Sequence, residues 1–126
     1  MTIRLRTAIT EVGPGVAELL EGGVLILFAE GAPPELAEMS ILHAVVEGPT
    51  ADAPPVGAEL KIGPVSTIVT ALGDAAWKKV ADIGHVVINF DGEETAGRPG
   101  EICAAPVNAG ELAAALKSGA EIVISD

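Results

Sequence analysis

Aromatic side chains are scarce in this sequence, which has two phenylalanines, one tryptophan and no tyrosine among 126 residues. Proteins that bind single-stranded nucleic acid without sequence preference stack the bases on aromatic rings, and this chain lacks the rings for such a platform. Hydrophobic residues nevertheless make up 49% of the chain. We therefore expect a core that is packed from valine, isoleucine, leucine and alanine.

Basic residues are few as well, seven against eighteen acidic ones, and the formal net charge is −11. Only Lys78 and Lys79 are adjacent in the sequence. Long-range repulsion from the phosphate backbone disfavours nucleic-acid binding. An acidic protein of this kind favours partners that present a positive contact face.

Long apolar stretches and cysteine pairs are also missing. The longest strongly apolar run, residues 24–29, is far shorter than the roughly 20 residues that span a bilayer, and no signal-type segment opens the chain. The single cysteine, Cys103, excludes an internal disulfide and lies in an apolar run that favours a buried, inert thiol. We expect a cytoplasmic protein.

The hydrophobic pattern is that of short strands separated by glycine and proline. Residues 3–12 alternate, with Ile3, Leu5, Thr7 and Ile9 on one face and Arg4, Arg6 and Thr10 on the other. Further strands are predicted at 24–28, 41–46, 59–62, 65–72, 85–90, 101–105 and 120–125. The pattern predicts one domain over residues 1–126, mainly all-β: a small closed antiparallel β-barrel, in preference to a sandwich, with one or two short helices.

The strongest helix signal covers residues 74–83, with Asp74 as the expected N-cap and Gly84 as the stop. Helical propensity rises again over residues 111–117. No phosphate-binding glycine loop and no dinucleotide fingerprint is present. With two histidines and one cysteine, a tetrahedral zinc site lacks ligands unless carboxylates contribute. We expect no cofactor and no bound metal.

The two histidines, His43 and His85, each lie at or near the start of a predicted strand. Either one can be a hydrogen-bonded structural residue, which is the commoner situation. Alternatively, the two imidazoles converge at one end of the barrel, where one serves as nucleophile and the other holds the transferred group. A metal site formed by both histidines and a carboxylate is a weaker alternative.

Three stretches of the chain carry recognisable motifs. They are Phe-Ala-Glu-Gly-Ala-Pro-Pro-Glu-Leu at 28–36 followed by Ile41-Leu42-His43, the region 72–92 with Gly-His-Val-Val-Ile-Asn-Phe-Asp-Gly, and Pro99-Gly100 with the apolar run behind it. These stretches resemble the glucitol/sorbitol-specific IIA family of the bacterial sugar phosphotransferase system. The similarity is collinear over nearly the whole chain. The chain departs from the family at Ala44-Val45, Pro54-Pro55 and Glu93-Glu94, which leaves the sugar specificity open.

The resemblance implies a closed-barrel phosphoryl carrier without a cofactor. It would accept phosphate from the histidine-containing phosphocarrier protein and pass it to the IIB component of a sorbitol permease, whose membrane-embedded IIC component would be its only link to the membrane. The family's phosphoryl-accepting histidine falls on His43, and we infer a supporting role for His85. The competing hypothesis is a small β-barrel that binds or senses a ligand without catalysis.

Overall fold

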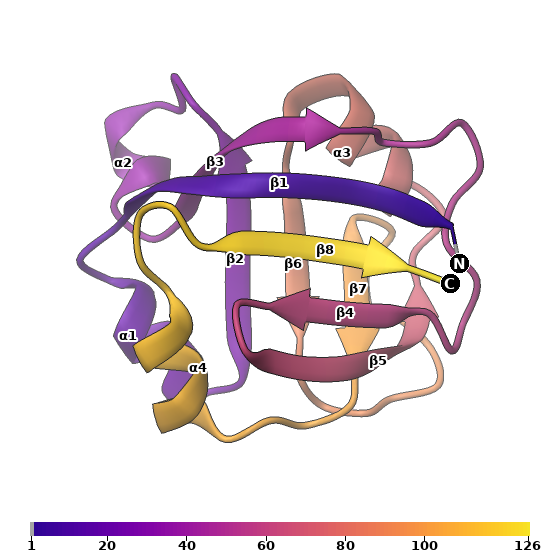
Figure 1. The fold of residues 1–126 in the computed structure, drawn as a ribbon. Coiled ribbons are helices and arrows are strands. Elements are labelled where there is room, and N and C mark those ends of the chain that lie inside the picture. Colours follow the sequence, from indigo (N-terminus) through magenta and orange to yellow (C-terminus); the bar gives the residue numbers. More distant parts are fainter. Residues whose placement is uncertain (1) are drawn as a thin grey trace.

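Eight strands and four short helices lie along residues 2–126, which are the residues that the computed structural model describes (Figure 1). The strands are β1 Ile3–Val12, β2 Val24–Ala29, β3 Ile41–Glu47, β4 Glu59–Ile62, β5 Val65–Leu72, β6 Val86–Asn89, β7 Glu101–Ala104 and β8 Glu121–Ser125. The helices are α1 Val16–Glu21, α2 Pro34–Ala37, α3 Ala76–Ile83 and α4 Ala109–Ala115.

The strands form one closed barrel in the order β1-β3-β2-β6-β7-β5-β4-β8, which confirms the predicted mainly-β barrel. The barrel is mixed and not purely antiparallel, which corrects our prediction: β2 and β3 pair in parallel, as do β6 and β7, and the other neighbours are antiparallel. The long connections 30–40 and 90–100 allow this, because a chain needs such a length to return to the same end of the neighbouring strand. The helices over residues 2–126 also exceed the predicted one or two.

The two ends of the described chain meet where β1 pairs with β8 (Figure 1). The Asp126 backbone N–H donates to the Thr2 carbonyl at 2.9 Å, and Arg4 Nε donates to Asp126 Oδ1 at 2.7 Å. The guanidinium of Arg4 lowers the pKa of the Asp126 carboxyl below its ordinary value. This pairing closes the barrel and leaves it without a free strand edge.

The barrel interior is filled by alternate residues of each strand. Leu5, Thr7 and Ile9 of β1 are buried and their neighbours are more exposed, as their alternation predicted. Aliphatic side chains dominate the interior, with Trp77 of α3 added at its edge. The indole N–H of Trp77 donates to the Thr50 carbonyl at 2.7 Å, which satisfies the polar atom of this buried ring.

Helix α3 begins one residue later than predicted, and Asp74 does not cap it. The N-cap is Ala75, without a side-chain hydrogen bond. The Ala75 N–H donates to the Pro99 carbonyl at 2.9 Å, so a distant loop anchors the start of the helix. Gly84 ends the helix in the left-handed conformation, as expected. Helix α4 is capped by Asn108, whose side chain accepts from the Glu111 N–H at 2.9 Å.

Candidate functional site at the two histidines

His43 is the last buried residue of β3, and its side chain points into the barrel. It lies opposite Ile9 of β1 and opposite Ala29 of β2. Only 2% of the residue is exposed. A buried imidazole in an aliphatic interior needs hydrogen-bond partners for both ring nitrogens. The structure provides both.

The Nδ1 atom of His43 lies 2.6 Å from Thr7 Oγ1, and Nε2 lies 2.7 Å from the Gly84 carbonyl oxygen. A carbonyl can only accept, so Nε2 carries the proton and Nδ1 accepts from the Thr7 hydroxyl. Burial lowers the pKa of His43, and the hydrogen bond to Gly84 opposes this only in part. The ring is therefore a neutral imidazole with a defined tautomer.

Gly84 provides the link between α3 and the imidazole. Its φ is +63°, a left-handed conformation that glycine adopts without steric cost. A Cβ atom at this position would lie 2.8 Å from the Ala29 Cβ atom. Only glycine therefore allows the end of α3 to approach β2 closely enough for the Gly84 carbonyl to reach His43.

His85 follows immediately, on the outer face of the barrel wall. Its Nδ1 lies 3.1 Å from the Leu27 carbonyl oxygen, and its ring packs on the outward-facing Phe28, with ring centroids 4.7 Å apart. Nδ1 therefore carries a proton, and Nε2 has no protein partner within residues 2–126. The backbone N–H of His85 donates to the Lys79 carbonyl at 3.3 Å. In contrast to His43, this ring is only partly buried.

The fold thus brings the two histidine segments together and turns the two rings in different directions. They share the Gly84 peptide: His43 donates to its carbonyl from inside, and His85 continues the chain outside. No hydrogen bond joins the two imidazoles. The expectation that His85 directly holds a group on His43 stays a prediction, and it requires rearrangement around Gly84.

Sequence reasoning missed Thr7 and Gly84 as members of this site. Thr7 carried a usable signal, because it is a hydroxyl residue on the inward face between Leu5 and Ile9. A buried hydroxyl in such a position needs a partner. Gly84 was identified only as a helix stop, and its carbonyl contact depends on β2 and β3, which no local pattern reveals.

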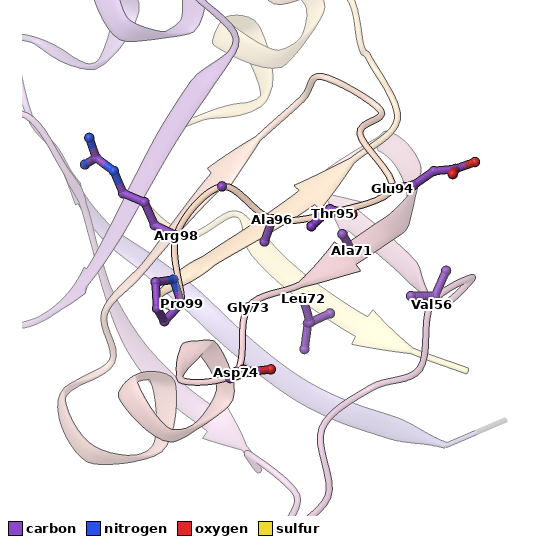
Figure 2. A pocket seen from close by; sticks show the side chains of 11 residues that line it. Val56, Ala71, Leu72, Gly73, Asp74, Glu94, Thr95, Ala96, Arg98 and Pro99 are labelled. Carbon is purple, nitrogen blue, oxygen red and sulfur yellow. The ribbon is translucent and has the colours of Figure 1, made fainter.

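Other candidate features lie away from this site. A cavity of about 480 Å³ includes Asp74 and Glu94 in its lining, as Figure 2 shows, and neither histidine takes part in it. Cys103 is buried, and burial raises the pKa of its thiol to about 11. Over residues 2–126, no group of three His, Cys, Asp or Glu side chains is arranged to hold a metal ion. In the same part of the chain, no helix is long and apolar enough to cross a membrane.

Comparisons with known proteins agree on one family. Residues 4–123 match the sequence model of the PTS system glucitol/sorbitol-specific IIA component family. Two relatives, the PTS system glucitol/sorbitol-specific EIIA components of Shigella flexneri and of Escherichia coli strain K12, are each 35% identical over 102 residues, which is 81% of this chain and 81% of each relative.

A solved structure supports the fold. The crystal structure of the PTS system IIA component from Enterococcus faecalis V583 matches with a TM-score of 0.72 over 96% of this chain and 99% of that one, at 18% identity. The family match, which covers nearly the whole length, agrees with the identity to the two relatives. This chain belongs to the glucitol/sorbitol-specific IIA component family of the sugar phosphotransferase system and is a phosphotransferase component.

Proposed function

We propose that the chain carries a phosphoryl group on His43, taken from the histidine-containing phosphocarrier protein and passed to the IIB component for sorbitol (glucitol) uptake through the IIC permease. The observation that carries this proposal is the state of the His43 ring. It is neutral, its tautomer is defined by two hydrogen bonds, and one bond is to a hydroxyl that can either donate or accept. The single buried cysteine is in keeping with a cytoplasmic setting.

Transfer requires access to a ring that is 2% exposed. Nε2 is bonded to the Gly84 carbonyl, so this carbonyl must move before Nε2 can accept a phosphoryl group. When it moves away, the ring can adopt its other tautomer, in which the proton stays on Nδ1 and the Nδ1–H donates a hydrogen bond to the Thr7 hydroxyl oxygen. The Nε2 atom is then left with a lone pair that can attack a phosphoryl group.

The chemistry of this step balances without a cofactor. The Nε2 lone pair attacks phosphorus, the phosphorus–nitrogen bond of the donor breaks, and the donor imidazole keeps the electron pair. Both rings retain the proton on their other nitrogen, so no base is needed. Catalysis then consists of in-line positioning and stabilisation of charge on the phosphoryl oxygens.

Mass spectrometry of the chain, incubated with the phosphocarrier protein, its kinase and phosphoenolpyruvate, tests this proposal. We expect one acid-labile phosphate, on the peptide that contains His43. His43→Gln should accept none, and its amide can still donate to the Gly84 carbonyl, so folding is preserved and is checked by circular dichroism. Phosphate on the His85 peptide would reverse the assignment. No phosphate at all would favour the non-catalytic binding module.

A further inference from the structure

A second cavity, of about 340 Å³, lies on the outer side of the wall beside His85. We call it the outer His85 cavity. Its lining includes Lys79, His85, Val87, Arg98, Gly100 and Glu101. This volume is near the lower end for ligand pockets, which suits a small ligand or a single group of a larger one.

Lys79 lies across Gly100 at the edge of this cavity. A Cβ atom at residue 100 would be 3.1 Å from Lys79 Nζ and 3.3 Å from its Cδ atom. The missing side chain of Gly100 therefore makes room for the lysine. Within residues 2–126, no carboxylate lies within ion-pair distance of Lys79 Nζ. The neighbouring Lys78 pairs with Asp82 at 3.2 Å instead.

Arg98 is held by a loop that is anchored to the start of α3. Gly73 permits this, because a Cβ atom there would lie 2.3 Å from the Pro99 carbonyl oxygen. Arg98 lines both the cavity of Figure 2 and the outer His85 cavity, and Figure 2 shows its side chain extending away from Asp74 and Glu94. In the described part of the chain, no carboxylate is within ion-pair distance of this guanidinium. Its charge is available to the outer His85 cavity.

The charge at this cavity is opposite in sign to that of the whole protein. Two of the seven lysine and arginine residues of a chain with net charge −11 line it, together with an imidazole whose Nε2 is free. One carboxylate, Glu101, lines it too, and Asn89 Nδ2 donates to this carboxylate at 3.0 Å. Two fixed cations against one hydrogen-bonded carboxylate favour an anionic ligand.

We propose that the outer His85 cavity binds a phosphoryl-type dianion. Lys79 and Arg98 supply the charge, and Nε2 of His85, which has no protein partner within residues 2–126, is left to face the ligand while Nδ1 stays on the Leu27 carbonyl. The same chemistry suits free phosphate and a phosphoryl group carried by a partner. In the second case, which rests on the function proposed above, the cavity holds the partner's phosphoryl group beside His85, the residue that follows Gly84.

Titration of the protein with inorganic phosphate, followed by NMR of the two imidazole rings, tests the site. We expect a saturable shift of the His85 ring signals and none with chloride at the same ionic strength. Lys79→Gln should weaken phosphate binding about tenfold, which is typical for the loss of one charge-assisted hydrogen bond. Lys78→Gln removes the same charge from the adjacent position and should leave the affinity unchanged.

A backbone variant provides a second test that removes no charge. Gly100→Ala displaces Lys79 and should also weaken phosphate binding. Its control is Gly97→Ala, where a Cβ atom would meet nothing closer than 3.9 Å. The proposal is overturned if phosphate gives no saturable shift at His85, or if Lys78→Gln weakens binding as much as Lys79→Gln.

Binding of the phosphocarrier protein separates the two sources of phosphate. If the ligand is a partner's phosphoryl group, Lys79→Gln weakens binding of the phosphorylated carrier more than binding of the unphosphorylated one. If both are weakened equally, the site takes free phosphate only. If the protein binds phosphate at His85 but never becomes phosphorylated, the phosphate site proposed here is supported. Only the function proposed above is then contradicted.

Discussion

At the scale of single residues, His43 and His85 differ in environment more than in sequence context. Both precede valine-rich strand segments, yet His43 has both ring nitrogens bonded inside the barrel, whereas one ring nitrogen of His85 has no partner among the described residues 2–126. A neutral, oriented ring is suited to accept a group, and a partly exposed ring near cations is suited to hold one. This division of roles can be tested separately at each position.

We expect His85→Ala to slow phosphorylation of His43 about a hundredfold without abolishing it, because one pre-placed donor contributes on the order of 3 kcal/mol at a transition state. Single-turnover transfer and melting temperature are measured on the same sample. A purely structural role predicts the reverse result, a lower melting temperature with an unchanged transfer rate in the folded fraction. That result would remove His85 from the transfer site.

The stability of the protein should depend on pH through His43. Burial lowers its pKa from the ordinary 6.5 in the folded state, so the unfolded chain binds more protons as the pH falls through that value. The contribution of the neutral ring to stability is thus fully present above about pH 7 and decreases as the pH falls below about 6.5. Urea unfolding at pH 7.5 and pH 5.5 should show a smaller loss in His43→Gln than in the wild type. An equal loss in both proteins would contradict this.

At the scale of elements, the junction of α3 and β6 is the part that positions the site. The helix ends at Gly84, whose carbonyl contacts His43 and whose Cα packs against Ala29. The following residue begins the outer cavity. Two consecutive residues, Gly84 and His85, therefore connect the buried imidazole of His43 with the outer face of the barrel.

Gly84→Ala should destabilise the protein by about 2 kcal/mol or more, since it combines a left-handed φ with a contact to β2 that is too close. It should also disturb the ring signals of His43. Gly119→Ala is the matched control: its φ is +92° and a Cβ atom there meets nothing within 4 Å. The free energy of unfolding of both variants is measured with urea, and the difference between them gives the cost of the contact with Ala29. Equal free energies would mean that this contact is unimportant.

At the scale of the whole molecule, the net charge of −11 governs association. This charge should attract a partner with a basic face. The attraction reaches about one Debye length, which is about 30 Å at 0.01 M salt and about 8 Å at 0.15 M salt. The association rate with the phosphocarrier protein should fall about tenfold or more over this range. Stopped-flow measurements check it, and a rate that does not change with salt would leave apolar docking as the only attraction.

Much of the molecule was predictable from the sequence, because short β-prone runs between glycines and prolines specify strands locally. All eight strands were expected close to their observed bounds, as was the helix that Gly84 ends. The alternation of Leu5, Thr7 and Ile9 also determined which face of β1 is buried. The family could be recognised in the same way, from motifs that lie within continuous stretches of chain.

The tertiary structure alone decided how those pieces meet. Parallel pairing of β2 with β3 and of β6 with β7 depends on the long connections 30–40 and 90–100, which return the chain to the same end of the neighbouring strand, and no local pattern encodes it. The start of α3 is also fixed by a distant loop, because the Ala75 N–H donates to the Pro99 carbonyl and Asp74 does not cap the helix. The directions of the two imidazoles follow from these pairings: His43 points inward because Ile9 and Ala29 lie beside it, and His85 lies outside because it packs on Phe28. Sequence determines which residues alternate, and long-range pairing determines which of them come together.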